Sequence, residues 1–249
     1  MKDESEEKST TDKSQRLRET FEEDYGYPLY PERKNPELFK EYSALNRRSA
    51  SVVEKKTVKC FTHCPELRIL REALREHGCE FNLRRNISVE KCDKKVSGGY
   101  DPNTNQIVLC HSGISPSVTC KLLFHEMTHM FDDCRAKVDF TNIEHLACTE
   151  IRAAAFADCG IISSLLNTTG FQIRNKHKEC VKKHALRSIL TTRNITEERG
   201  KQVIDSVFDK CYNDVAPFDS HKLSEGDYYD KYMKMKKKDE TKLPKFRFL

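Results

Sequence analysis

The stretch Lys121-Leu-Leu-Phe-His125-Glu126-Met-Thr-His129-Met-Phe131 contains a pattern whose spacing is itself chemically informative. His125 and His129 are four residues apart, so on an α-helix they project from one face and both imidazoles can reach one metal ion. Glu126 lies beside them, and a carboxylate there can take a proton from a zinc-bound water, whose pKa zinc lowers to about 7. The pattern predicts the helix of a zinc hydrolase, with His125 and His129 as ligands and Glu126 as the catalytic base.

Apolar residues around this motif favour a helix that is buried. They recur at spacings of three, four and five residues, as expected for an inward-facing surface: Val118, Leu122, Leu123, Met127, Met130 and Phe131. We therefore expect a buried helix with a polar notch, and a third zinc ligand on an element that follows it.

A second helix is expected from residue 143 to about 159, with Asn142 as its N-cap. Glu150 on this helix is the favoured third ligand, because a helix-loop-helix return can place its carboxylate against the metal. Asp139 in the connecting segment and His145, which lies off the Glu150 face, remain alternatives. Catalytic zinc keeps three protein ligands and one open position, so one of these three residues is enough.

Four further residues near these helices have expected roles of their own. Arg152 and Asp158 are candidates for holding the ligands in place. Cys134 is expected to be half of a disulfide, and Arg135 a solvated charge.

Upstream of the metal helix, two helices and then strands are expected. The helices span 36–53 and 66–77, and the strands 81–89 and 106–110, with a turn at 101–105 before the second strand. Downstream, two amphipathic helices at 178–190 and 196–212 are expected to close the core.

This order indicates an α+β fold, a zincin-like metalloprotease that is mainly helical, with a small antiparallel sheet before the active-site helix. An extended substrate could pair with an edge of that sheet above the metal.

Composition indicates one catalytic domain with solvated ends. The chain has 249 residues, 37% apolar and 33% charged, with a net charge of +5. We expect a disordered segment at 1–20, a zinc metalloprotease domain at 21–220 and a basic tail at 221–249. The chain start is acidic and lacks an apolar core, so no secretory signal is expected, and no apolar run is long enough to span a membrane. No DNA-binding signature accompanies the basic tail, so no nucleic acid is expected as a partner.

Eleven cysteines lie in the middle of the chain, at positions 60, 64, 79, 92, 110, 120, 134, 148, 159, 180 and 211. They indicate either a disulfide framework or buried thiols with a second zinc site that begins at Cys60 and Cys64, with His63 between them. No second pair at zinc-finger spacing follows, so disulfides are favoured. Because eleven is odd, at least one thiol stays unpaired within the chain.

Several segments together carry a family resemblance. They are His125 to Arg135, Val138-Asp-Phe, His145 to Ala153, Val207 to Asp214 and Pro217-Phe-Asp219. In these segments the chain resembles the mitochondrial inner-membrane metalloproteases that mature ATP synthase subunit 6, a family also described as Ku-binding proteins. The resemblance covers about residues 55 to 220.

The resemblance implies a zinc endopeptidase of the intermembrane space, held peripherally at the inner membrane. Its protein substrate would be the precursor of ATP synthase subunit 6, and it would also assist assembly of the membrane sector. His125 and His129 would bind Zn²⁺ and Glu126 would be the base. The cysteine richness would explain import by oxidative trapping without a presequence.

The two ends of the chain lie outside the resemblance. In the tail, Tyr228, Tyr229, Tyr232 and Met235 beside lysines are candidates for contact with anionic inner-membrane lipid. Two other functions remain open, a non-proteolytic assembly chaperone and a nuclear DNA-repair scaffold.

Overall fold

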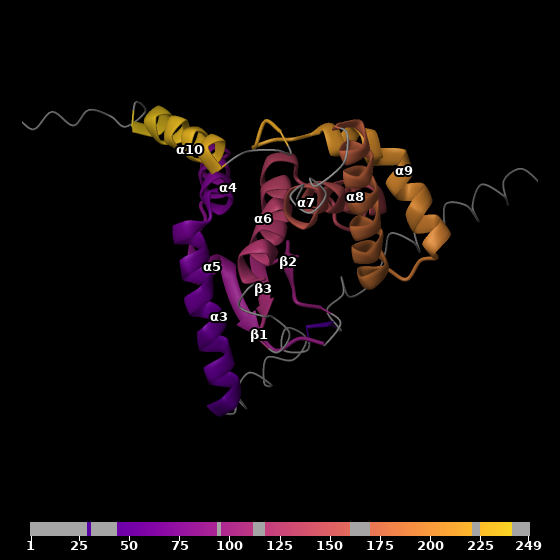
Figure 1. Ribbon diagram of the computed structural model, residues 1–249. Coiled ribbons are helices and arrows are strands. Elements are labelled where there is room, and N and C mark those ends of the chain that lie inside the picture. The colour runs from indigo at the N-terminus through magenta and orange to yellow at the C-terminus, as the bar shows by residue number, and fades with distance from the viewer. Residues whose placement is uncertain are drawn as a thin grey trace, which may run out of the picture.

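Helix α6 (Thr119–Ala136) lies at the centre of the fold, between the sheet and the helices that follow it (Figure 1). Its apolar side chains Leu123, Met127 and Phe131 are fully buried, and the polar Glu126 and His129 are buried beside them. The expected buried helix with a polar notch is therefore present. The computed structural model describes residues 29–30, 44–93, 96–111, 118–159, 170–220 and 225–240, so the segment expected to be disordered, 1–20, lies outside it.

Within the described residues, the sheet has three strands in the order β1-β3-β2. They are β1 (Ile87–Glu90), β2 (Gly98–Asp101) and β3 (Gln106–Cys110). Strand β2 was not expected as a strand, and it forms an antiparallel hairpin with β3 around the expected turn. Strand β1, within the strand expected at 81–89, pairs with β3 in parallel, so the sheet is mixed rather than antiparallel. Strand β3 lies in the middle of the sheet, with β1 on one side and β2 on the other. Strand β2 is the edge strand nearest α6.

The first strand is also shorter than expected. Residues Leu83–Asn86 form a short helix, α5, because the side chain of Asn82 caps it by accepting a hydrogen bond from the Arg84 N–H. An Asn at that position supplies a local hydrogen bond that competes with strand pairing.

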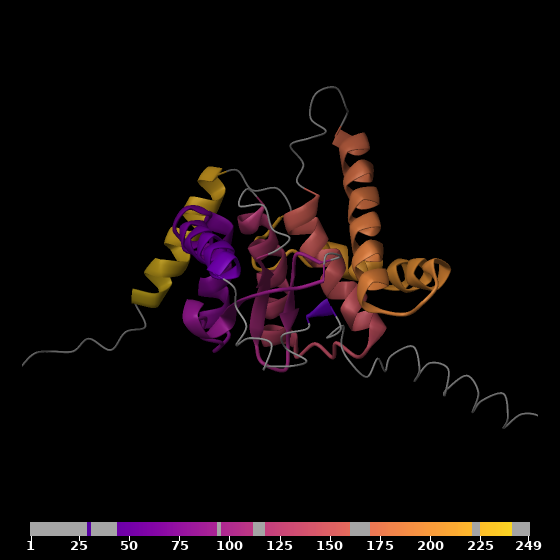
Figure 2. The ribbon, with the colours of Figure 1, turned by 90° about the horizontal axis from the view of Figure 1, so that it is seen from below.

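The helices divide between two sides of the molecule. Helices α3 (Ala44–His63) and α4 (Pro65–Glu76) pack with α6 and the sheet. Helix α7 (Ile143–Ala153), its π-helical extension η3 (Ala154–Asp158), α8 (Gly170–Thr192) and α9 (Glu197–Asn213) build a second apolar cluster. Figure 2 shows α8 and α9 on the opposite side of the molecule from α3 and α4.

Helix α3 differs from the helix expected at 36–53. It continues to His63 because Val53, Thr57 and Cys60 extend its buried stripe beyond the expected end. Residues 36–43 lie outside the described part of the chain. The helices expected at 66–77, 178–190 and 196–212 are confirmed within α4, α8 and α9.

Part of the expected basic tail is a docked helix. Residues Glu225–Glu240 form α10, which packs against α4 (Figure 1). Tyr232 is buried there, with the Arg68 guanidinium over its ring. Its side chain is therefore not exposed for the contact with lipid that was expected of it. Tyr229 is 55% exposed. None of the helices in the described segments is long and apolar enough to cross a membrane.

The expected disulfide framework is confirmed among the described residues. The pairs are Cys60–Cys120, Cys79–Cys134, Cys92–Cys110, Cys148–Cys211 and Cys159–Cys180, and Cys64 is free. Because Cys60 is bonded to Cys120, the alternative zinc site that would begin at Cys60 is wrong. A loop of 60 residues closed by such a bond stabilises the fold by about 4 kcal/mol in the chain-entropy description.

Candidate metal centre

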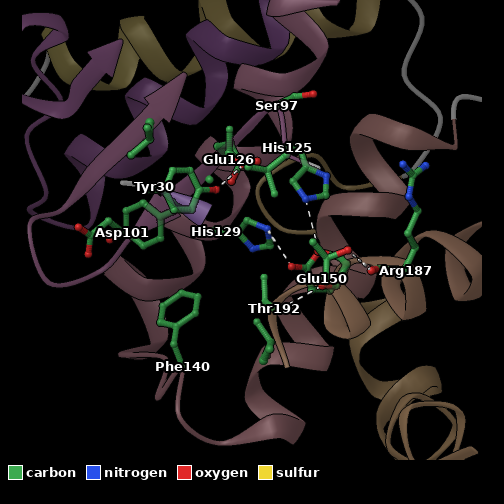
Figure 3. Close-up of a pocket in the computed structure, with 18 of the residues that line it drawn as sticks. Tyr30, Ser97, Asp101, His125, Glu126, His129, Phe140, Glu150, Arg187 and Thr192 are labelled. Atoms are coloured by element: carbon green, nitrogen blue, oxygen red, sulfur yellow. Dashed lines mark hydrogen bonds and ion pairs between the residues drawn. The ribbon is translucent and has the colours of Figure 1, made fainter. Parts of the chain in front are cut away.

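The structure brings His125 and His129 of α6 together with Glu150 of α7 (Figure 3). His125 Nε2 lies 3.4 Å from Glu150 Oε2, and His129 Nε2 lies 3.7 Å from Glu150 Oε1. The side chains of His129 and Glu150 are each only 6% exposed. The crossing of α6 and α7 therefore points two imidazoles and one carboxylate at a single position.

This donor set fits a zinc ion. Ligand atoms held at zinc distances in tetrahedral geometry are about 3.3 Å apart, close to the nitrogen-to-oxygen separations observed here. Glu150 Oε2 is buried and has no hydrogen-bond partner among the described residues. A buried acceptor without a donor is destabilising, and a cation at this position would remove the penalty.

The two alternative ligands lie elsewhere. Asp139, in the connection before α7, and His145, in the first turn of α7, are exposed and contact each other, since the Asp139 N–H donates to His145 Nδ1. The Asp139 carboxylate accepts from the N–H and hydroxyl of Thr141. The structure does not bring either residue to His125 and His129.

His125 is held by Asp158, at the end of η3. His125 Nδ1 lies 2.8 Å from Asp158 Oδ2, and Lys121 Nζ lies 3.4 Å from the other carboxylate oxygen. Burial raises the pKa of Asp158, but the hydrogen bond from His125 and the neighbouring charges of His125, Lys121 and His184 together outweigh burial and bring the pKa to about 2. Asp158 thus makes the supporting contact considered from the sequence.

His129 is held through a chain of buried side chains. His129 Nδ1 lies 2.9 Å from Thr149 Oγ1, and the Thr149 hydroxyl donates to Asp132 Oδ2 at 2.9 Å. Arg152 Nε donates to the same carboxylate at 2.9 Å. Sequence reasoning found Arg152 but missed Thr149 and Asp132, because nothing in their spacing shows that α6 and α7 cross there.

Arg135 is not the solvated charge expected. Its side chain is 20% exposed and bridges Asp132 at 3.0 Å and Asp214 at 2.6 Å. Burial lowers the pKa of Arg135, but the hydrogen bond to Asp214 and the nearby Asp132 charge raise it overall. The two carboxylates draw Arg135 toward the same network that supports His129.

Glu126 faces the same centre. Its carboxylate is buried and accepts a hydrogen bond from the backbone N–H of Tyr100 in β2. Burial raises the pKa of Glu126 to about 7, against the lowering effect of His125. Burial also lowers the pKa of His129 to about 4, which favours the neutral imidazole that a metal requires.

The centre opens into a cavity of about 300 Å³. Strand β2 forms one wall, and α8 residues including His184, Arg187 and Ser188 form another. Figure 3 shows Tyr30, Asp101 and Phe140 on the side of His129 away from Arg187. A cavity of this size beside two imidazoles and two carboxylates is suited to a metal-assisted hydrolysis.

The edge of β2 that faces away from β3, to which no strand pairs among the described residues, lines this cavity. The Ser97 C=O accepts from the Cys110 N–H, so antiparallel alternation turns the N–H and C=O of Gly98 and Tyr100 away from β3. The Tyr100 N–H reaches Glu126, and the Gly98 C=O accepts from the Tyr30 hydroxyl at 2.8 Å. The sheet edge therefore presents backbone groups beside the Glu126 carboxylate.

The chain matches a family model described as the Peptidase M76 family over residues 51–219. It is 40% identical over 202 residues to the mitochondrial inner membrane protease ATP23 homolog of Xenopus laevis, covering 79% of this chain and 86% of the relative. It is 41% identical over 211 residues to the Danio rerio protein of the same name, covering 79% and 78%. The Homo sapiens protein of that name is 43% identical over 157 residues, covering 62% and 63%.

No solved structure matches the chain. The family match spans the metal helix and both neighbouring halves of the fold, and the relatives cover most of the sequence. The chain therefore belongs to the Peptidase M76 family.

Proposed function

We propose that this peptidase is a zinc-dependent endopeptidase, with His125, His129 and Glu150 as zinc ligands and Glu126 as the general base. The observation that carries the proposal is the convergence of two imidazole nitrogens and one unpartnered carboxylate oxygen beside a buried glutamate. Two histidines and one glutamate are a ligand set used by zinc peptidases.

Each residue has a defined part in the reaction. A zinc ion, when bound, supplies a Lewis acid that polarises the peptide carbonyl and acidifies water. Glu126 accepts a proton from the attacking water and returns it to the departing amine nitrogen as the C–N bond breaks. The Tyr100 N–H holds the Glu126 carboxylate in position for both transfers.

The substrate backbone is proposed to lie along the edge of β2 that faces away from β3. An extended peptide there would pair with the outward N–H and C=O groups of this edge, as in other cases of strand addition. The Gly98 C=O, which the Tyr30 hydroxyl now holds, would accept a substrate N–H instead. This placement brings a scissile bond over Glu126.

We place the enzyme in the mitochondrial intermembrane space, peripheral to the inner membrane, with the precursor of ATP synthase subunit 6 as substrate. The relatives' names support the organelle and the membrane. Ten of the eleven cysteines are in disulfides, which persist in oxidising environments. The same observation argues against the alternative of a nuclear scaffold with reduced thiols.

The substitution Glu126→Gln tests the proposal. It keeps the shape of the side chain but removes the base, so cleavage of the subunit precursor is expected to fall by about 100-fold or more. Glu54→Gln on the exposed surface of α3 is the matched control and is expected to cleave normally. Unchanged cleavage by the Glu126→Gln enzyme would disprove the peptidase mechanism.

Assembly of the ATP synthase membrane sector is proposed as a second activity of the same chain. The Glu126→Gln protein also separates this activity from proteolysis, because a chaperone needs the fold but not the base. Restored assembly in cells that carry only this variant would show that the two activities are separable.

A further inference from the structure

We propose that Thr149 is a positioning residue that, together with Asp132 and Arg152, fixes the tautomer and direction of the His129 ring. The inference rests on the proposed zinc site. Its physical basis is a chain of hydrogen bonds from His129 through the Thr149 hydroxyl to the Asp132 carboxylate and the Arg152 guanidinium.

The direction of the hydrogen bonds follows from the chemistry of each group. An ionised carboxylate only accepts, so the single proton of the Thr149 hydroxyl goes to Asp132. The Thr149 oxygen can then only accept from His129 Nδ1, which must carry the ring proton. Nε2 is left with its lone pair, directed toward Glu150 and the metal position.

Burial makes this arrangement rigid. Thr149, Asp132 and His129 are all buried, and the Arg152 side chain is only 1% exposed. Arg152 also donates to the backbone carbonyls of Asp214 and Ala216, which hold its guanidinium from the other side. With its charge matched by Arg152, Asp132 stays an acceptor, and burial keeps the Thr149 hydroxyl away from bulk solvent.

The two histidines are thus oriented by different means. His125 donates directly to Asp158, whose side chain is 18% exposed. His129 depends on a neutral hydroxyl and reaches a carboxylate only at the second step. Removal of one hydroxyl should therefore disconnect His129 from its carboxylate and leave His125 unaffected.

The test compares threonine-to-valine substitutions at two buried sites. Thr149→Val removes the acceptor of the His129 Nδ1 proton at nearly constant volume. Thr128→Val is the matched control, because Thr128 is equally buried, precedes His129, and donates only to the Phe124 carbonyl of its own helix. Zinc dissociation constants are measured by competition with a chromogenic chelator.

The zinc dissociation constant of Thr149→Val is expected to rise by about 10- to 100-fold, the range typical of lost outer-sphere partners. Thr128→Val and the conservative Thr149→Ser, which keeps the hydroxyl, are expected to bind zinc like the unmodified protein. Equal zinc affinity in Thr149→Val and Thr128→Val would overturn the inference.

A second measurement needs no variant of the network. Nitrogen-15 spectra of the histidine rings in the zinc-loaded protein, with the His129 ring assigned through its scalar couplings to its own backbone, are expected to show the proton on Nδ1. A proton on Nε2 would overturn the inference even if Thr149→Val failed to fold. If the unmodified protein itself binds no zinc, the proposed function fails; if it binds zinc and Thr149→Val binds equally well, only this inference fails.

Discussion

Burial and unused hydrogen-bonding capacity favour Glu150 as the proposed third ligand. Glu150 is buried with one oxygen unpartnered, whereas Asp139 and His145 are exposed and already paired locally. Glu150→Gln, which leaves a poorer neutral ligand, is expected to weaken zinc binding by about 100-fold or more, beyond the effect of a supporting residue. Asp139→Asn and His145→Gln are expected to bind zinc normally, so a chelator competition that finds the loss in either of them would reassign the ligand.

For single residues, the sequence predicts a role only where that role depends on neighbours along the chain. The four-residue spacing of His125 and His129 needs only a helix, so it could be interpreted without the fold. Glu150 could not be separated from its alternatives, because the choice depends on how α7 returns to α6. Thr149 and Asp132 carry no pattern of their own, and they become meaningful only where the two helices cross.

Among the elements, strand β2 is the most constrained by close packing. A Cβ at Gly98 would lie 2.5 Å from the Val108 carbonyl oxygen of β3, which is backbone and cannot move without breaking the sheet. A Cβ at Gly99 would collide instead with the Tyr30 hydroxyl, the far end of a side chain. Gly98→Ala is therefore expected to cost about 1–3 kcal/mol of unfolding free energy, and Gly99→Ala less.

The Tyr30 contact gives this comparison a control. Tyr30→Phe removes the atom that the new methyl group would meet, so Gly99→Ala should cost less in the Tyr30→Phe background, while Gly98→Ala should remain costly in both because it meets backbone. Denaturant titrations measure all four differences. Equal costs for the two alanines, with no dependence on Tyr30, would contradict the packing of β2.

The turn at 101–105 and strand β3 were predictable because their signals are local, whereas strand β2 and the parallel pairing of β1 were not. Strand alternation shows that residues can form a strand but does not show which neighbour they choose. The C-terminal helix illustrates the same limit, since a lysine-rich segment suggests a solvated tail until α4 supplies a surface for Tyr232. Partner choice between distant segments is the part of the fold that one sequence leaves open.

On the scale of the whole molecule, the disulfides and the metal centre have complementary roles. Three disulfides lie in the part built around α3, α4, α6 and the sheet, and two lie in the part built around α7, α8 and α9. Among the described residues none crosses between the two parts. The candidate zinc site does cross, because α6 supplies the histidines and α7 supplies Glu150. The ion pair of Arg152 in α7 with Asp132 in α6 crosses at the same place.

Zinc is therefore expected to hold the two parts of the molecule together, because each disulfide stabilises only the part that contains it. Zinc at 1,000 times its dissociation constant should raise the free energy of unfolding by about 4 kcal/mol, and its removal by a chelator should lower the melting temperature with all disulfides intact. Hydrogen exchange should then increase mostly where α6 meets α7, rather than in the sheet near Cys92–Cys110 or in α9. His129→Gln should remove the response to zinc, and a uniform increase in exchange across both parts on chelation would show that the metal does not join them.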